Sequence, residues 1–93
     1  MRDILAIYNR MKTIILSAAA AKDLDNLPAK AREQVSDAII KYAMTGEGNV
    51  KAMKNRPGYR LRSGDYRVIF DEDTNTILAI YIGKRETTTY RRN

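Results

Sequence analysis

The chain has 93 residues, of which 17 are Lys or Arg and 11 are Asp or Glu, and its net charge at pH 7 is +6. This length predicts a single domain with an open site, and the charge favours a polyanionic partner: nucleic acid, an anionic membrane or an acidic protein. The sequence contains no cysteine and no histidine, which excludes disulfides and thiolate catalysis and argues against a zinc enzyme. No apolar run is long enough to span a bilayer, so we expect a cytoplasmic protein.

The first segment, residues 1–11, is expected to be a leader, and residues 12–93 are expected to form the single domain. Ile4, Leu5 and Tyr8 recur at helical spacing. This pattern is compatible with a short amphipathic turn and equally with a frayed terminus.

The domain is predicted to begin with a buried strand over residues 12–16, followed by two helices. Ser17 can cap the first helix through its hydroxyl, and Pro28 ends that helix and can open the second. The second helix is expected to end at residues 45–48, a segment that contains Gly46 and Gly48. Its apolar face is formed by Ala31, Val35, Ala38, Ile39, Tyr42 and Ala43.

In the second half of the chain, the pattern of apolar residues changes from the helical period of 3.6 to the strand period of two. Residues 59–63, 65–71 and 76–84 predict three strands joined by tight turns. The preceding segment, residues 51–58, contains a Pro-Gly pair and is interpreted as a basic linker or edge segment. The predicted fold class is α+β in the order β-α-α-β-β-β, with a helical hairpin packed on one face of a small, mainly antiparallel four-stranded sheet.

Alternation along these strands assigns their side chains to two faces. The helix-covered face is expected to hold Leu61, Tyr66, Val68, Phe70, Leu78, Ile80 and Ile82. The open face is expected to hold Arg60, Arg62, Arg67, Ile69, Ile77, Ala79, Tyr81, Gly83 and Arg85, with Lys51, Lys54 and Arg56 near its edge.

Four arginines on one face without interleaved acids point to an anionic ligand, because the guanidinium fork binds phosphate through two parallel hydrogen bonds. The alternative is a solvated sheet face, on which exposed charges have no further role. Tyr59, Tyr81 and Tyr90 are candidate stacking surfaces for bases.

The segments YRLRSGDYRVIFDED and ILAIYIGKRETTTY resemble the RelE/ParE superfamily of bacterial toxins from toxin–antitoxin systems. Members show an LR-x-G-x-YR segment, a hydrophobic strand, a G-[KH]-R segment and a tyrosine near the C-terminus. The ending is more similar to RelE, a ribosome-dependent mRNA endonuclease, than to ParE, which inhibits DNA gyrase. The resemblance implies growth arrest through mRNA cleavage on the ribosome without a metal or other cofactor, and a hetero-oligomer with a cognate acidic antitoxin.

The resemblance also implies roles for individual residues. Arg67 and Arg85 match arginines that hold the scissile phosphate, and Tyr90 approximates the C-terminal tyrosine, so these three are the candidate catalytic residues. The candidate RNA-binding residues are Lys51, Lys54, Arg56, Arg60, Arg62 and Tyr81.

RelE has lysines at positions where this chain has Gly58 and Arg60. Arginine is a poor general base because its pKa lies above about 12. Lys54 or Tyr90 is then the candidate base, unless orientation and charge stabilisation suffice. The alternative function is a ParE-like gyrase inhibitor that binds protein without catalysis, and a third is an inactive toxin retained as a partner of its antitoxin.

Overall fold

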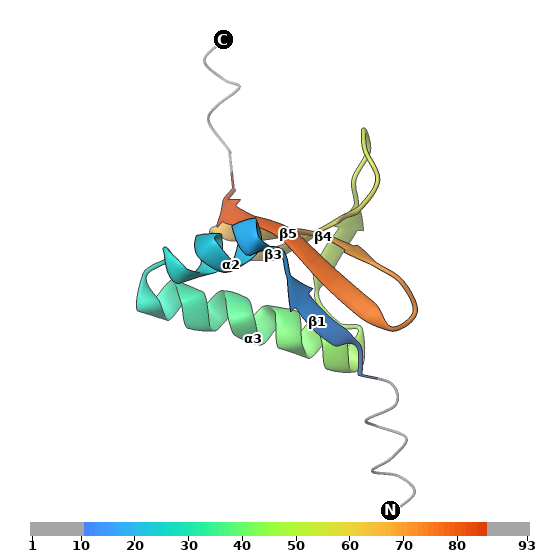
Figure 1. The fold of residues 1–93 in the computed structure, drawn as a ribbon, viewed down its shortest axis with the longest axis horizontal. Helices are drawn as coiled ribbons and strands as arrows, with labels where there is room; N and C mark the ends of the chain where they lie inside the picture. Colours follow the sequence, from blue (N-terminus) through green and yellow to red (C-terminus); the bar gives the residue numbers. More distant parts are fainter. Residues whose placement is uncertain (1–10, 86–93) are drawn as a thin grey trace, which may run out of the picture.

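The structure is a computed structural model that describes residues 11–85 of the chain, so most of the expected leader and Tyr90 lie outside the described residues. In chain order its elements are β1 (Thr13–Leu16), α2 (Ala18–Asp25), α3 (Ala29–Thr45), β2 (Asn49–Ala52), β3 (Tyr59–Ser63), β4 (Tyr66–Glu72) and β5 (Thr76–Lys84). Both helices lie on the same face of the sheet (Figure 1), which confirms the expected α+β class.

The described part of the sheet has five strands in the order β1-β5-β4-β3-β2, one strand more than the sequence predicted. β1 pairs with β5 in parallel, and the other neighbouring strands pair antiparallel. The additional strand, β2, begins before the segment interpreted as a linker and overlaps it. The four residues of β2 are too few to show an alternating pattern in the sequence. The strand is defined by its pairing with β3, which places Lys51 opposite Arg60.

The helix boundaries follow from local chemistry. The Ser17 hydroxyl accepts a hydrogen bond from the Ala20 N–H at 3.0 Å and caps α2 as expected. Pro28 is the N-cap of α3, one position before its first residue. Gly46 ends α3 with a φ of 78°, a left-handed conformation that glycine adopts without steric cost.

The core lies between the helices and the sheet and centres on Phe70, which is 1 % exposed. The rings of Tyr42 and Tyr59 both lie 5.6 Å from the Phe70 ring, centroid to centroid. Tyr59 therefore packs against the core, and the expectation that it offers a stacking surface for bases is wrong. The other buried members of the core are Ala20, Val35, Ile39, Ala43, Leu61, Val68, Ile77, Ala79 and Ile82.

An irregularity in β5 changes the expected faces. Ile69 of β4 pairs with Tyr81, whereas the next residue, Phe70, pairs with Ala79. Ile80 is therefore an extra residue in β5, which is the arrangement of a β-bulge.

The bulge reverses the assignment for the first half of β5. Ile77 and Ala79, expected on the open face, are buried at 2 % and 0 % exposure, whereas Leu78, expected in the core, is 37 % exposed. Beyond Ile80 the assignment is as expected, because Ile82 is buried and is part of the core. Almost every residue of β5 is apolar, so its sequence is compatible with either set of alternate residues facing the core.

Candidate functional site

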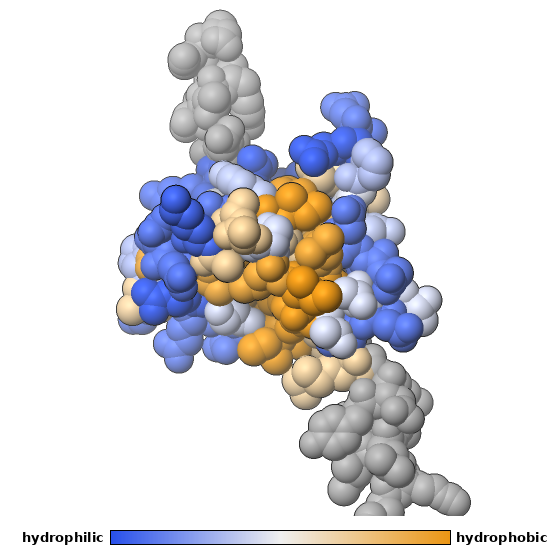
Figure 2. All heavy atoms as spheres, viewed as in Figure 1, coloured by the Kyte–Doolittle hydropathy of each residue, from blue (hydrophilic) through white to orange (hydrophobic). Residues whose placement is uncertain are grey.

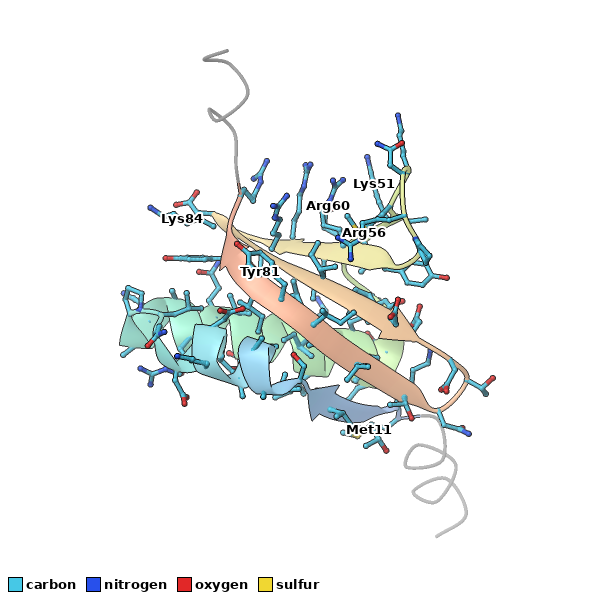
Figure 3. All side chains as sticks on the ribbon, turned by 45° about the horizontal axis from the view of Figure 1, so that its top comes forward. Met11, Lys51, Arg56, Arg60, Tyr81 and Lys84 are labelled. Atoms are coloured by element: carbon cyan, nitrogen blue, oxygen red, sulfur yellow. The ribbon has the colours of Figure 1, made fainter. Side chains whose placement is uncertain are left out.

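The open face of the sheet, on the side away from α2 and α3, carries two rows of side chains that run across the strands. One row consists of Lys51, Arg60, Ile69 and Tyr81, and the adjacent row consists of Asn49, Arg62, Arg67 and Gly83. Figure 3 shows Lys51 and Arg60 projecting from the sheet on the side opposite the helices. The strand register thus brings together residues from four strands, and we call this surface the basic face.

Like charges are directly opposed on the basic face. Arg62 of β3 pairs with Arg67 of β4, an arrangement that is destabilising between cross-strand neighbours. Two ion pairs are seen between described residues, and neither involves Arg60 or Arg67. A surface that keeps such charges close together is suited to an anionic ligand.

The basic face is partly dehydrated although no helix covers it. Ile69 is only 6 % exposed, and its row neighbours are Arg60 and Tyr81. We infer that their side chains cover Ile69, because the aliphatic part of an arginine packs well on apolar surface.

The Nε atoms of Arg60 and Arg67 are buried and form no hydrogen bond within residues 11–85. A buried donor without a partner costs about 1–3 kcal/mol, which an anion that supplies an acceptor can recover.

Tyr81 lies over Gly83 and beside Arg67. The Arg67 Cζ atom is 5.9 Å from the centre of the Tyr81 ring, within the range of a cation–π contact. A Cβ atom at Gly83 would approach Tyr81 Cζ to 2.7 Å and would also collide with the tyrosine hydroxyl. Gly83 therefore makes room for this ring, a role that sequence reasoning missed, although a glycine within an apolar strand is a known sign of close approach.

Arg85 lies beyond these rows, next to the turn between β3 and β4. Its backbone N–H donates to the Asp65 carbonyl at 2.8 Å, and its guanidinium Nη1 donates to the Gly64 carbonyl at 3.3 Å. This second bond occupies one of the five N–H donors of the guanidinium group.

The loop between β2 and β3 extends the positive charge beyond the sheet edge. Lys51, Lys54, Arg56 and Arg60 line the same hollow, whose volume is about 580 Å³. Their position at the edge of the open face agrees with the sequence analysis.

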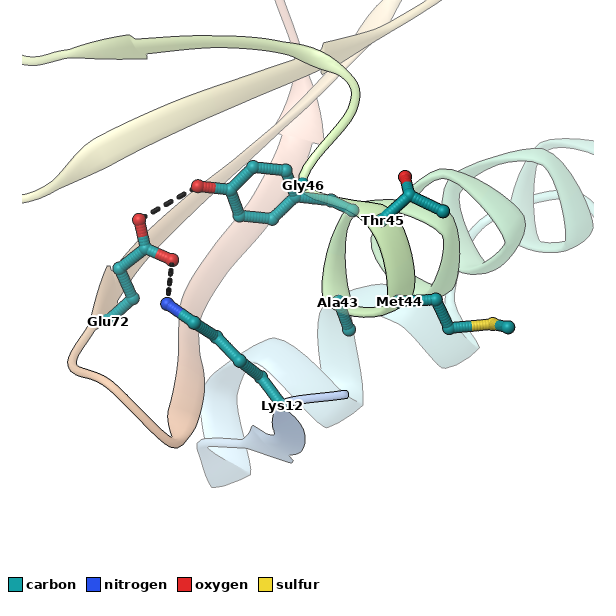
Figure 4. A pocket seen from close by; sticks show the side chains of 7 residues that line it. Lys12, Ala43, Met44, Thr45, Gly46 and Glu72 are labelled. Carbon is teal, nitrogen blue, oxygen red and sulfur yellow. Dashed lines mark hydrogen bonds and ion pairs between the residues drawn. The ribbon is translucent and has the colours of Figure 1, made fainter. Parts of the chain in front are cut away.

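A second polar cluster lies close to the end of α3, away from the basic face (Figure 4). Glu72 accepts hydrogen bonds from the Tyr42 hydroxyl and from Lys12 Nζ, each at 2.8 Å. Burial, together with the hydrogen bond to the Glu72 carboxylate, raises the pKa of Tyr42 to about 12. Lys12 immediately precedes β1, so the three bonded side chains tie the start of β1 to α3 and β4.

The sequence model of ParE toxins from type II toxin–antitoxin systems matches residues 14–88. The chain belongs to this toxin family. The superfamily resemblance is confirmed, and the protein is the toxin component of a type II toxin–antitoxin system.

Solved structures support the fold of the toxin. The RelBE2 toxin–antitoxin complex from Mycobacterium tuberculosis matches with a TM-score of 0.71 and 20% identity over 81% of this chain and 92% of that chain. The YoeB dimer from Staphylococcus aureus matches with a TM-score of 0.65 and 19% identity over 84% and 99% of the two chains. The intact RelBE complex from E. coli matches with a TM-score of 0.60 and 20% identity over 82% and 99%. No curated protein sequence matches the toxin significantly.

The described part of the toxin places its ionisable groups in distinct regions. Of the candidate catalytic residues, Arg67 and Arg85 lie on or beside the basic face.

Within residues 11–85, no three His, Cys, Asp or Glu side chains come together in a way that could hold a metal ion. None of the helices in that part of the chain is long and apolar enough to cross a membrane.

Proposed function

We propose that this toxin acts in the cytoplasm and inhibits translation by cleaving mRNA on the ribosome. The observation that carries the proposal is the gathering of arginines on the basic face, where the buried Nε atoms of Arg60 and Arg67 form no hydrogen bond within the described chain. An RNA strand supplies a regular series of phosphate acceptors, and single-stranded RNA offers bases that stack on aromatic rings such as the exposed Tyr81.

In the proposed reaction a ribose 2′-hydroxyl loses its proton and attacks the neighbouring phosphorus, and the displaced 5′-oxygen of the next nucleotide takes up a proton from solvent. The products are a 2′,3′-cyclic phosphate and a 5′-hydroxyl end. Negative charge grows on the phosphate oxygens in the transition state. Arg67 and Arg85 stabilise that charge as fixed cations in a partly dehydrated site.

The proton of the attacking hydroxyl needs an acceptor. Lys54 in the basic loop and Tyr90 are the candidates for this acceptor, since arginine is a poor general base. Tyr42 is excluded as the base, because its hydroxyl is bonded to Glu72 away from the basic face. Orientation of the 2′-hydroxyl for in-line attack contributes to the rate whichever group takes the proton.

The proposal is tested by single-turnover cleavage of mRNA on programmed ribosomes. Arg67→Ala and Arg85→Ala are each expected to slow cleavage about 100-fold, with much less effect on ribosome binding. Arg85→Lys is expected to recover part of the rate, because an ammonium keeps the charge without the bidentate geometry. The matched control is Lys22→Ala, which removes an exposed cation from α2. Cleavage at the wild-type rate in both alanine variants would exclude the proposed site.

A second candidate function is inhibition of DNA gyrase without catalysis. It is favoured by the match to the ParE model and by Gly58 and Arg60 at positions where RelE has lysines. A supercoiling assay distinguishes the two functions. A wild-type toxin that blocks gyrase supercoiling and leaves ribosome-bound mRNA intact would establish the second function in place of the first.

A further inference from the structure

β5 has different neighbours along the edge that faces β1. Over its first residues, Thr76–Ala79, it pairs in parallel with β1, which ends at Leu16. From Ser17 the chain turns into α2, so no described strand lies beside residues 80–84 on this edge. α2 packs against that half of β5 instead (Figure 1). The backbone groups of this half therefore need partners other than a strand.

The Ile82 N–H group lies at this edge and is shielded from water. Ile82 is only 2 % exposed, and Figure 2 shows a broad apolar surface over β1 and the adjoining part of β5. A buried N–H group that lacks a partner is destabilising. The Ile82 N–H thus depends on an acceptor that a neighbouring element supplies.

Two side chains from the start and the middle of α2 bond to this edge. The Ser17 hydroxyl donates to the Ile80 carbonyl at 3.2 Å, and the Ile82 N–H donates to Asp23 Oδ2 at 3.0 Å. The Ala79 carbonyl also faces this side, because it accepts from the Ser17 N–H at 2.9 Å. Adjacent carbonyls of a regular strand point to opposite sides, so the bulge at Ile80 brings both carbonyls to the same edge. The bulge and the two side-chain bonds form one local arrangement.

The segment held in this way carries the contribution of β5 to the basic face. Tyr81 and Gly83 flank Ile82, and Gly83 lies directly opposite Arg67 in the strand register. The Tyr81 ring covers Gly83, and its centre lies 5.9 Å from the Arg67 Cζ atom. Arg85 follows at the end of the same segment. A shift of Ile82 would move these side chains relative to Arg67.

We propose that Asp23 is a positioning residue for mRNA cleavage. Its carboxylate holds the Ile82 amide and thereby sets the places of Tyr81 and Arg85 relative to Arg67. Asp23 does not touch the RNA, because it belongs to α2, on the side of the sheet opposite the basic face. The inference rests on the proposed function, since the groups that Asp23 positions are those proposed to act on mRNA.

A small displacement of Ile82 is enough to slow the reaction. Cations that stabilise charge growing on the phosphate must be fixed close to it. A misplacement of about 1 Å caused by a distant substitution can cost about 100-fold in rate. β4 still holds the other edge of β5 when the Asp23 carboxylate is removed, so the shift is a fraction of that. We therefore expect a loss of about tenfold in rate.

The test is single-turnover cleavage of mRNA on programmed ribosomes at saturating toxin. Asp23→Ala should lower the rate constant of the bound complex about tenfold and leave the affinity for ribosomes equal to that of Asp25→Ala. Asp25→Ala is the matched control, because it removes the same charge from an exposed position of the same helix. Asp23→Asn should retain most of the rate, because its side-chain carbonyl still accepts from the Ile82 N–H. Asp23→Glu replaces Asp23→Ala if the latter does not fold, and it should be slower than Asp23→Asn because its carboxylate lies one methylene further out.

Two measurements separate positioning from a general loss of stability. In an Arg85→Ala background, Asp23→Ala should cost much less than it does in the wild type, because the cation that it helps to place is gone. NMR gives a signature that does not depend on cleavage. The Gly83 Hα chemical shift, which the ring current of Tyr81 influences, should move in Asp23→Ala toward its value in Tyr81→Ala, whereas Asp25→Ala should leave it unchanged.

Several results would overturn the proposal. They are equal cleavage rates for Asp23→Ala and Asp25→Ala, the same loss in the wild-type and Arg85→Ala backgrounds, or an unchanged Gly83 Hα shift in Asp23→Ala with an intact circular dichroism spectrum. A wild-type toxin that cleaves no mRNA would refute the proposed function instead. The Gly83 Hα shift would then decide by itself whether Asp23 positions Tyr81 on the basic face.

Discussion

Removal of the Glu72 carboxylate should destabilise the toxin more than any other single charge removal described for it. Glu72 accepts hydrogen bonds from Lys12 and Tyr42, each at 2.8 Å, and its side chain is only 16 % exposed. Glu72→Ala leaves the ammonium and the phenol without their acceptor at the junction of β1, α3 and β4. The variant also opens the pocket beside the end of α3.

The magnitude follows from the two contacts. A hydrogen bond to a charged group contributes about 1.5–3 kcal/mol, and a half-buried ion pair lies between the exposed value of about 0.2–1 kcal/mol and the larger buried value. We expect Glu72→Ala to lower the free energy of unfolding by about 2–3 kcal/mol. For a chain of this size, that is a fall in Tm of about 10 °C or more. Glu72→Gln should lose about half as much, because its amide oxygen still accepts from Tyr42.

Urea unfolding followed by circular dichroism measures these differences. The matched control is Glu47→Ala, because the Lys41–Glu47 pair is 3.9 Å apart with side chains 64% and 71% exposed. That variant should stay within about 0.5 kcal/mol of the wild type. If Glu72→Ala proves as stable as Glu47→Ala, the cluster does not hold the three elements together.

Three further results are expected. The pKa of Tyr42 is raised from its ordinary value of 10.0 to about 12, so its contribution to stability is complete below pH 10 and is lost as the pH rises through 12. In denaturant unfolding across this range, the free energy of unfolding should therefore fall less for Tyr42→Phe than for the wild type. Arg60→Ala should reduce the slope of log affinity against log salt for single-stranded RNA by about 0.7, whereas Lys30→Ala, on the far side of the molecule, should leave the slope unchanged. Gly83→Ala should weaken RNA binding by displacing Tyr81 from Arg67, and it should add little in a Tyr81→Ala background; additive effects in this double-mutant cycle would show that Gly83 does not act through Tyr81.

The elements with strong local signals were predictable from the sequence. Ser17 and Gly46 mark helix ends through side-chain and backbone chemistry that operates within a few residues. The strands β3 and β5 have the predicted bounds, because the polar turns between the strands interrupt the alternating pattern.

Features that depend on pairing between distant segments were not predictable. The bulge at Ile80 is a property of how β5 meets β4, and a strand that is apolar at nearly every position gives no sign of it. The burial of Ile69 also depends on the register that places Arg60 and Tyr81 beside it. For the candidate site, strand alternation placed Arg60, Arg62 and Arg67 on the open face, as the structure has them, whereas the position of Tyr81 over Gly83 required the three-dimensional structure.

Analysis of the RNA ends produced by wild-type toxin on programmed ribosomes tests the central proposal most directly. We predict mRNA cut within the ribosome-bound segment, with a 2′,3′-cyclic phosphate on one fragment and a 5′-hydroxyl on the other. The corresponding mRNA should stay intact with the Arg67→Ala toxin over the same time. Intact mRNA with the wild-type toxin, under conditions in which the same preparation inhibits gyrase supercoiling, would contradict the account.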